Sequence, residues 1–194
     1  MAATADRSKP FIPLSGVAED GWSKEDEATA TCFCGAVQLV FVSPPALFVH
    51  LHLLLSSNTH QPTHGPGLVR AFVCNCYDCR KLTASMFASN VTIQDPYLRY
   101  VRGRDNLTVY SQAKTTTSGK AMTNYFCKTC GTLMNRIGDA FPGRNFIRLG
   151  TVDDFTLHET KLRPTVELFT KDRVSWFAGV PGGNVTAIKG SGTK

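Results

Sequence analysis

The stretch Val73–Ser89 reads VCNCYDCRKLTASMFAS, and its cysteines decide how the whole chain is interpreted. Three of the seven cysteines stand here, with one residue between the first two and two residues between the last two. Such spacing places thiols on one tight turn, where the sulfur atoms can converge on a metal ion about 2.3 Å away. The stretch therefore predicts a metal-binding turn followed by a short helix over Cys76–Ser85.

The other four cysteines form two similar pairs, Cys32-x-Cys34-Gly35 and Cys127-x-x-Cys130-Gly131. The glycine after each pair permits the left-handed turn that directs backbone N–H groups toward sulfur. Zinc is the default metal for a soft, redox-silent set of thiolates. Seven ligands divide naturally into four and three, which predicts two zinc ions per chain. The alternatives are one structural zinc with three free thiols, and disulfides or another metal.

The four-cysteine set predicts a closed structural zinc site, made of Cys32, Cys34, Cys127 and Cys130. The remaining three, Cys74, Cys76 and Cys79, predict a zinc with an open fourth position. An open position is what separates a catalytic zinc from a structural one.

Composition favours one mainly β domain. The chain has 194 residues, 42% of them hydrophobic and 19% charged, which is enough apolar material for a core. Short β-branched runs separated by glycines indicate strands, and no stretch sustains a helical period for long. The strands expected are Ala36–Val42, Leu68–Val73, Met86–Ile93, Leu107–Tyr110, Met122–Phe126, Thr132–Arg136, Phe146–Thr151 and Thr165–Thr170.

The predicted boundaries are a flexible N-terminal tail over 1–27, a zinc domain over 28–180 and a C-terminal tail over 181–194. Residues 43–67 form an atypical insertion with no charge and four of the five histidines. Such a length is unusual for a connection in a compact β domain. It is interpreted as a lid, a disordered insertion, a lineage-specific loop or a translated intron. Extra metal binding by its histidines, which are His50, His52, His60 and His64, is disfavoured because nothing fixes their geometry.

Charge and hydropathy indicate a cytoplasmic protein with no membrane partner. Met1–Pro10 is polar and resembles no signal peptide, and the longest apolar run, Ala46–Leu55, is far short of the roughly 20 residues that cross a bilayer. The formal charge of +6 raises the question of nucleic acid. Seven thiolates subtract seven charges and two zinc ions add four, which leaves a net charge of +3. The basic residues also form no cluster in the sequence, so nucleic acid is an unlikely partner.

With these motifs in this order, the sequence resembles the glutathione-dependent formaldehyde-activating family, whose domain also occurs in centromere protein V. The elements that carry the resemblance are TCFCGAVQLVF, VCNCYDCRKLTASMFAS, TNYFCKTCGTLMNR, and LGTVDD followed by RVSW. The resemblance implies a β-tent fold of small antiparallel sheets stabilised by zinc. By position, it assigns Cys32, Cys34, Cys127 and Cys130 to the structural zinc, and Cys74, Cys76 and Cys79 to the active-site zinc.

The function implied by the resemblance is a carbon–sulfur lyase activity that joins glutathione and formaldehyde reversibly into S-hydroxymethylglutathione. The expected partners are therefore a small thiol such as glutathione and an aldehyde. The alternative is a non-catalytic zinc module that binds protein or nucleic acid. The complete three-cysteine group favours the enzyme, because a binding module has no need of an open zinc.

Several other residues carry weaker expectations. Arg80 follows the last ligand of the open site, where a guanidinium would offset the charge of a three-thiolate zinc or bind a substrate carboxylate; the alternative is a surface arginine. Ser85, Asn90 and Asn124 are candidates to line the site. Glu167 stands where the resemblance leads one to expect a histidine.

Two expectations concern packing. His158 is predicted to lie at the surface, and Trp176 and Phe177 are predicted to attach the C-terminal segment to the core.

Overall fold

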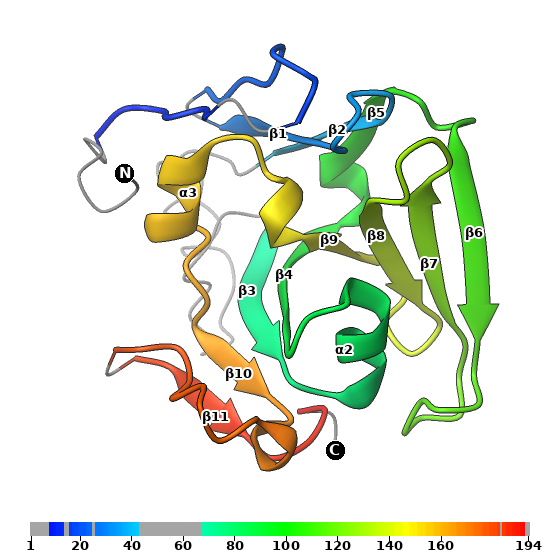
Figure 1. Cartoon of the computed structure of the whole chain (residues 1–194), viewed down its shortest axis with the longest axis vertical. Helices are drawn as coiled ribbons and strands as arrows, with labels where there is room; N and C mark the ends of the chain where they lie inside the picture. The colour runs from blue at the N-terminus through cyan, green and yellow to red at the C-terminus, as the bar shows by residue number, and fades with distance from the viewer. Residues whose placement is uncertain (1–7, 14–15, 25, 43–66, 183, 193–194) are drawn as a thin grey trace, which may run out of the picture.

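A computed structural model describes residues 8–13, 16–24, 26–42, 67–182 and 184–192, which form two β-sheets with few helices (Figure 1). The smaller sheet has the order β1 (Glu27–Thr31), β2 (Gln38–Val42) and β5 (Leu98–Arg102). The larger sheet has the order β11 (Thr186–Ile188), β10 (Val166–Leu168), β3 (Leu68–Cys74), β4 (Ala88–Gln94), β9 (Arg144–Arg148), β8 (Leu133–Gly138), β7 (Met122–Cys127) and β6 (Leu107–Gln112).

The helical elements are short. They are the α-helices α2 (Tyr77–Thr83) and α3 (Phe155–Glu159) and the 3-10 turns η2 (Asp95–Tyr97), η3 (Leu149–Thr151) and η4 (Thr170–Asp172). The prediction of a mainly β fold with little helix is confirmed. None of the described helices is long and apolar enough to span a bilayer.

All eight predicted strands correspond to strands of the structure, with shifts of a few residues at their ends. The sequence reasoning missed β1, β5 and β11. The first consists of small residues, EATAT, and β5 carries two arginines in LRYVR, so neither has a strong hydrophobic pattern. Pairing with β2 holds both of these strands in place.

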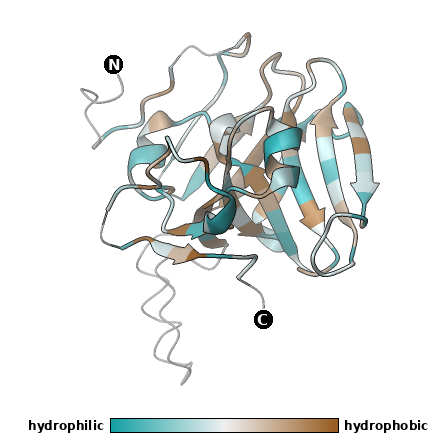
Figure 2. Ribbon diagram, turned by 60° about the horizontal axis from the view of Figure 1, so that its bottom comes forward, coloured by the Kyte–Doolittle hydropathy of each residue, from teal (hydrophilic) through white to brown (hydrophobic). Residues whose placement is uncertain are grey.

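The two faces of the larger sheet have different roles. One face packs on the smaller sheet, and this main core is formed by residues such as Leu39 and Phe41 from β2 and Ile93 and Ile147 from the larger sheet. The opposite face carries a second cluster around Phe72, which includes two of the cysteines. Figure 2 shows hydrophobic and hydrophilic residues alternating along strands, the pattern expected when each strand serves two environments.

One end of the larger sheet departs from the expected antiparallel pairing. Strand β10 runs parallel to both β3 and β11, whereas the other pairs are antiparallel. The parallel strand reaches β3 after a long excursion through α3, as the yellow-to-orange path in Figure 1 shows. This connection brings Leu168 beside Cys74.

Described parts of both predicted tails contact the domain. The backbone N–H of Phe11 donates to the Asp154 carboxylate at 3.0 Å, and the N–H of Val17 donates to the carbonyl of Phe33 at 2.9 Å. At the other end, β11 is the outermost strand of the larger sheet.

The aromatic prediction for the C-terminal segment is half right. Phe177 is half-buried and stacks on Phe87 with 4.4 Å between ring centroids. Trp176 is 71% exposed, so its prediction as core was wrong. The backbone turns here, with the N–H of Phe177 donating to the carbonyl of Val174 at 3.2 Å, and the two adjacent rings differ in exposure.

Of the predicted insertion 43–67, only Gly67 is described, so the histidines at 50, 52, 60 and 64 lie outside the described residues. A Cβ added to Gly67 would lie 2.6 Å from the carbonyl oxygen of Val42, so the two ends are in contact. The described segments that end at Val42 and begin at Gly67 therefore meet directly in the fold.

We expect a variant in which a linker of about four residues replaces 43–66 to keep its fold, with about 1–2 kcal/mol more stability, because a shorter loop costs less closure entropy. Urea unfolding and zinc content measured beside the full chain check this prediction. Loss of folding or of zinc would show that the segment contributes to the structure.

His158 is half-buried rather than at the surface, contrary to prediction. It lies on α3, its Nε2 has no hydrogen-bond partner among the described residues, and its ring meets Phe155 edge-on at 5.0 Å. Burial lowers the pKa of His158 below its usual range, and a hydrogen bond with the Leu149 backbone, followed by the charges of Asp154 and Glu159, opposes this only in part.

A histidine whose pKa is lowered in the folded state contributes stability above its unfolded pKa of about 6.5, and this contribution is lost as the pH falls further. We therefore expect acidification from about pH 7.5 to 5.5 to lower the thermal midpoint less in His158→Phe than in the parent. Equal slopes for the two proteins would contradict this assignment.

Candidate metal centres

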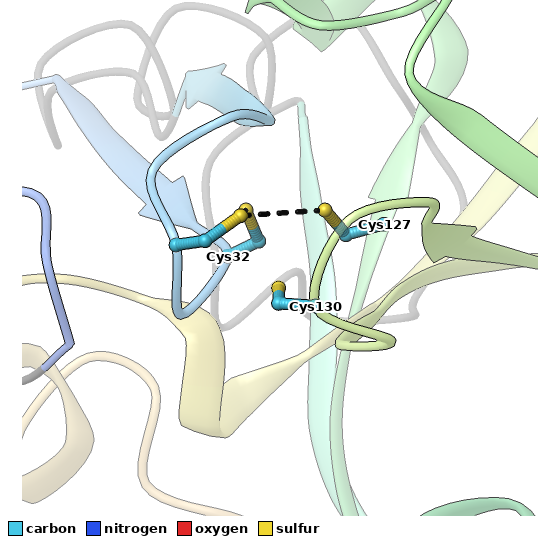
Figure 3. A group of neighbouring side chains, drawn as sticks. Cys32, Cys127 and Cys130 are labelled. Atoms are coloured by element: carbon cyan, nitrogen blue, oxygen red, sulfur yellow. Dashed lines mark hydrogen bonds between the residues drawn. The ribbon is translucent and has the colours of Figure 1, made fainter.

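Four cysteines converge between the two sheets. Cys32 and Cys34 lie on the turn between β1 and β2, whereas Cys127 ends β7 and Cys130 lies on the turn that leads to β8. Their four sulfur atoms lie within 4.8 Å of one another, and Figure 3 shows the two turns presenting them to a common centre. The chain segments that meet here are separated by 93 residues between Cys34 and Cys127.

The sulfur separations fit a tetrahedral zinc. Cys34 Sγ lies 3.6 Å from Cys32 Sγ and 3.7 Å from Cys127 Sγ. Ligands about 2.3 Å from a tetrahedral centre stand about 3.8 Å apart. The four residues present therefore fit a structural zinc ion in ligand type and in spacing.

Polar groups around these sulfur atoms favour ionised thiols at some positions. The backbone N–H of Val37 donates to Cys32 Sγ at 3.2 Å. Burial nevertheless raises the pKa of Cys32 to about 12. At Cys130, burial also opposes ionisation, but hydrogen bonds from the side chain and backbone of Thr132 outweigh it and lower the pKa to about 6. A metal cation bound by all four sulfur atoms would favour the thiolate form at every position, including Cys32.

The other three cysteines meet at the junction of β3 and α2. Cys74 is the last residue of β3, Cys76 is the N-cap of α2, and Cys79 lies in its first turn. Their sulfur atoms also lie within 4.8 Å of one another. The helix forms here because Cys76 Sγ accepts a hydrogen bond from the backbone N–H of Cys79 at 3.4 Å, as an N-cap side chain does.

This second cluster is a three-ligand set, and the described residues place no fourth His, Cys, Asp or Glu with it. Cys74 and Cys79 are buried, whereas Cys76 is half-buried. Hydrogen bonds with Cys74 and Cys76, helped by the positive charges of Arg148 and Arg136, hold the pKa of Cys79 well below its usual range. Hydrogen bonding with Cys76 and Cys79 and burial raise the pKa of Cys74. The arginine charges and neighbouring thiols therefore favour the thiolate form of Cys79, which is the form that binds a cation.

Sequence reasoning missed the two arginines beside this cluster. Arg136 on β8 donates from Nη1 to Cys79 Sγ at 3.5 Å, and Arg148 on β9 donates to Asn90. Both side chains are buried, and each stands in a strand whose residues are mostly buried, LMNRIG or RNFIR. A charged residue within a buried strand is rare without a specific role, and that signal could have identified them.

Arg80, the arginine singled out from the sequence, lies elsewhere. Its guanidinium donates to the carbonyl of Met86 at 3.1 Å and to the carbonyl of Asp172, and it lies 5.4 Å from the Tyr77 ring centre. These contacts tie α2 to neighbouring loops. A direct role for Arg80 at the metal cluster remains a prediction.

The three polar candidates are placed differently. Asn90 and Asn124 are buried side chains of β4 and β7, on the sheet face that carries Cys74. Ser85 follows α2, and its N–H donates to the carbonyl of Arg80.

Glu167 supports the loop between two of the cysteines. Asn75, which lies between Cys74 and Cys76, is fully buried and donates from Nδ2 to Glu167 Oε1 at 2.9 Å and to the carbonyl of Leu168 at 3.1 Å. Arg173 donates to the same carboxylate at 3.2 Å. The glutamate at this position is therefore built into a buried network that fixes the metal-binding turn.

Removing the Glu167 carboxylate should destabilise this turn. In Glu167→Ala, the buried Asn75 amide keeps only its bond to the Leu168 carbonyl, and the partly exposed Arg173 guanidinium loses its carboxylate partner. We therefore expect a loss of about 1–3 kcal/mol in unfolding free energy and weaker retention of metal. Glu167→Gln keeps an acceptor for Asn75 and should cost less. Chemical unfolding and metal analysis of both variants check this, and equal stability of Glu167→Ala and the parent would contradict it.

The fold and the two clusters define a mainly β protein with two separate cysteine sites that fit zinc. A family model described as glutathione-dependent formaldehyde-activating enzyme matches residues 59–172, more than half of the chain. The chain therefore belongs to this family. The matched range contains Cys74, Cys76 and Cys79 but begins after the first cysteine pair. In the structure this first pair, Cys32 and Cys34, lies beside Cys127 and Cys130, which are within the matched range.

The chain is similar to the crystal structure of a Rhodobacter sphaeroides protein, with 24% identity, a TM-score of 0.42, and coverage of 63% of this chain and 85% of that one. No curated protein is a significant match.

Proposed function

We propose that the protein is a zinc-dependent enzyme of the carbon–sulfur lyase type, which forms or breaks the bond between the sulfur of a small thiol and the carbonyl carbon of an aldehyde. Glutathione and formaldehyde are the substrates that the family membership suggests. The observation that carries the proposal is the three-thiol cluster of Cys74, Cys76 and Cys79, separate from the four-thiol cluster. The proposed setting is the cytoplasm, where thiols stay reduced.

The proposed reaction needs no oxidant or reductant. In the forward direction the thiol sulfur bonds to the carbonyl carbon, the carbonyl double bond becomes a single bond, and the thiol proton ends on the oxygen. The reverse reaction restores the thiol and the aldehyde. Both directions require a site that tolerates negative charge on sulfur or oxygen.

The residues of the second cluster suit this chemistry. Cys74, Cys76 and Cys79 would hold a zinc ion, and such an ion supplies an electrophilic position for sulfur or for a carbonyl oxygen. Arg136, which contacts Cys79, adds positive charge on the same side of the sheet. Asn75 and Glu167 keep the turn of the ligands in place.

Native mass spectrometry and a turnover assay test the proposal together. We expect two zinc ions per chain, and we expect catalytic amounts of the protein to accelerate exchange between glutathione and ¹³C-formaldehyde measured by NMR. A protein that holds one zinc and leaves the exchange rate unchanged would instead be a non-catalytic zinc module, and the proposal would be wrong.

A further inference from the structure

Buried polar groups without a partner gather on the sheet face that carries the three-cysteine cluster. Eight buried side-chain nitrogen or oxygen atoms lack a hydrogen-bond partner among the described residues, and five of them belong to Thr92, Asn124, Arg136 and Arg148. These residues share a face, because Thr92 and Arg136 each stand opposite Phe146, and Asn124 stands opposite Arg136. Directly opposed residues of antiparallel strands point to the same side.

The two arginines are the most unusual members of this group. Arg148 is 5% exposed and Arg136 is 8% exposed. Arg148 uses one nitrogen on Asn90 and leaves Nε and Nη2 without a partner, and Arg136 leaves Nε without one. In the described ranges, no carboxylate forms an ion pair with either guanidinium. Unpaired N–H donors on a buried cation are costly to maintain.

The charge of the cluster does not account for both arginines. Three thiolates and one Zn²⁺ sum to a formal charge of −1, whereas two guanidinium groups carry +2. Even with metal bound, one positive charge and several N–H donors remain beside Cys79. An anion with two or more acceptor oxygens would neutralise the remaining positive charge and accept hydrogen bonds from the free N–H groups.

We propose that Arg136 and Arg148 form a subsite for a carboxylate of the substrate; this inference rests on the proposed function and narrows its substrate class. Arg136 Nη1 lies 3.5 Å from Cys79 Sγ, so the bound carboxylate lies next to the metal ligands. The substrate then carries its carboxylate close to the reacting atom. The carboxylate belongs either to the aldehyde, as in a 2-oxo acid of the glyoxylate type, or to the thiol, as in a mercapto acid.

Inert probes test this subsite without turnover. The full-length, zinc-loaded protein is titrated with oxamate, which mimics a 2-oxo acid, and with its uncharged counterpart acetamide. Mercaptoacetate and 2-mercaptoethanol form the matching thiol pair. Because a ligand that binds only the folded state raises the unfolding midpoint, we expect a concentration-dependent rise with oxamate, with mercaptoacetate or with both, beyond that of the uncharged partner. A rise with only one of the two charged probes identifies which substrate carries the carboxylate, and a rise with both shows that the subsite accepts either.

Variants assign the binding to the arginines. We expect Arg148→Gln and Arg136→Gln to lower the affinity for the active probe by about 10- to 100-fold, the usual effect of losing a charged hydrogen-bond donor. Arg148→Lys keeps the positive charge but lacks the paired N–H donors of a guanidinium. It replaces the glutamine variants in the test if these do not fold. Arg144→Gln is the matched control, because Arg144 is exposed and lies on the same face of the same strand.

The outcomes separate the two proposals. No effect of either anion on the parent, or unchanged binding in the folded Arg148 variants, would overturn the carboxylate subsite whatever the activity. Arginine-dependent binding in a protein that catalyses no thiol–aldehyde exchange would leave the subsite standing and refute the proposed function.

Discussion

Replacing Cys130 by serine should abolish the stable fold. The four-cysteine cluster joins the β1–β2 turn of the smaller sheet to the β7–β8 turn of the larger one. A structural zinc contributes about 10–16 kcal/mol of apparent binding free energy in small zinc domains, which exceeds the whole stability of a typical domain. Losing one of four ligands should therefore release the ion and separate the sheets.

The choice of Cys130 isolates the effect of the metal from that of packing. Its side chain is only half-buried, and its contact with the Thr132 hydroxyl, at 3.2 Å, can be made by a serine. Circular dichroism, solubility and metal analysis of purified protein give the readout. A soluble, folded Cys130→Ser protein with its full zinc content would refute the assignment of a structural site.

Replacing Cys76 by serine should leave a folded protein that has lost its second zinc and its activity. Serine is a favoured N-cap residue, so α2 keeps the capping hydrogen bond that Cys76 now accepts from Cys79. The second cluster lies within one continuous segment, from Cys74 to Cys79, and joins no distant parts of the chain. We expect the affinity for the second zinc to fall by at least about 100-fold.

Each of the two variants is the control for the other, because each removes one cysteine from a different cluster. Native mass spectrometry measures the zinc content of both. The expected pattern is one zinc and a parental unfolding midpoint for Cys76→Ser, with thiol–aldehyde exchange below about 1% of the parent. Unfolding of Cys76→Ser, or parental activity with a single zinc, would contradict the division of the seven cysteines into a structural set and a functional set.

The strands that the sequence predicted and those it missed differ in how they are stabilised. Strands such as β3 (LVRAFVC) carry enough apolar side chains to be recognised alone. By contrast, β1 and β5 belong to a sheet that exists because β2 lies between them. Trp176 and His158 were misplaced for a related reason, since the path of the chain around them depends on contacts distant in the sequence.

The cysteine spacing by itself determined the two candidate metal sites, because one- and two-residue gaps constrain sulfur atoms through local backbone geometry. It also separated four ligands from three, and the structure brings together the same groups. Only the tertiary structure decided which charged groups surround the second site. Arg136 contacts Cys79, and Arg148 brings its positive charge near the same thiol, because β3, β4, β9 and β8 are neighbours in one sheet. Arg80, although adjacent to Cys79 in sequence, turns with α2 to other partners. Strand pairing depends on contacts between segments far apart in the chain, and no local spacing contains that information.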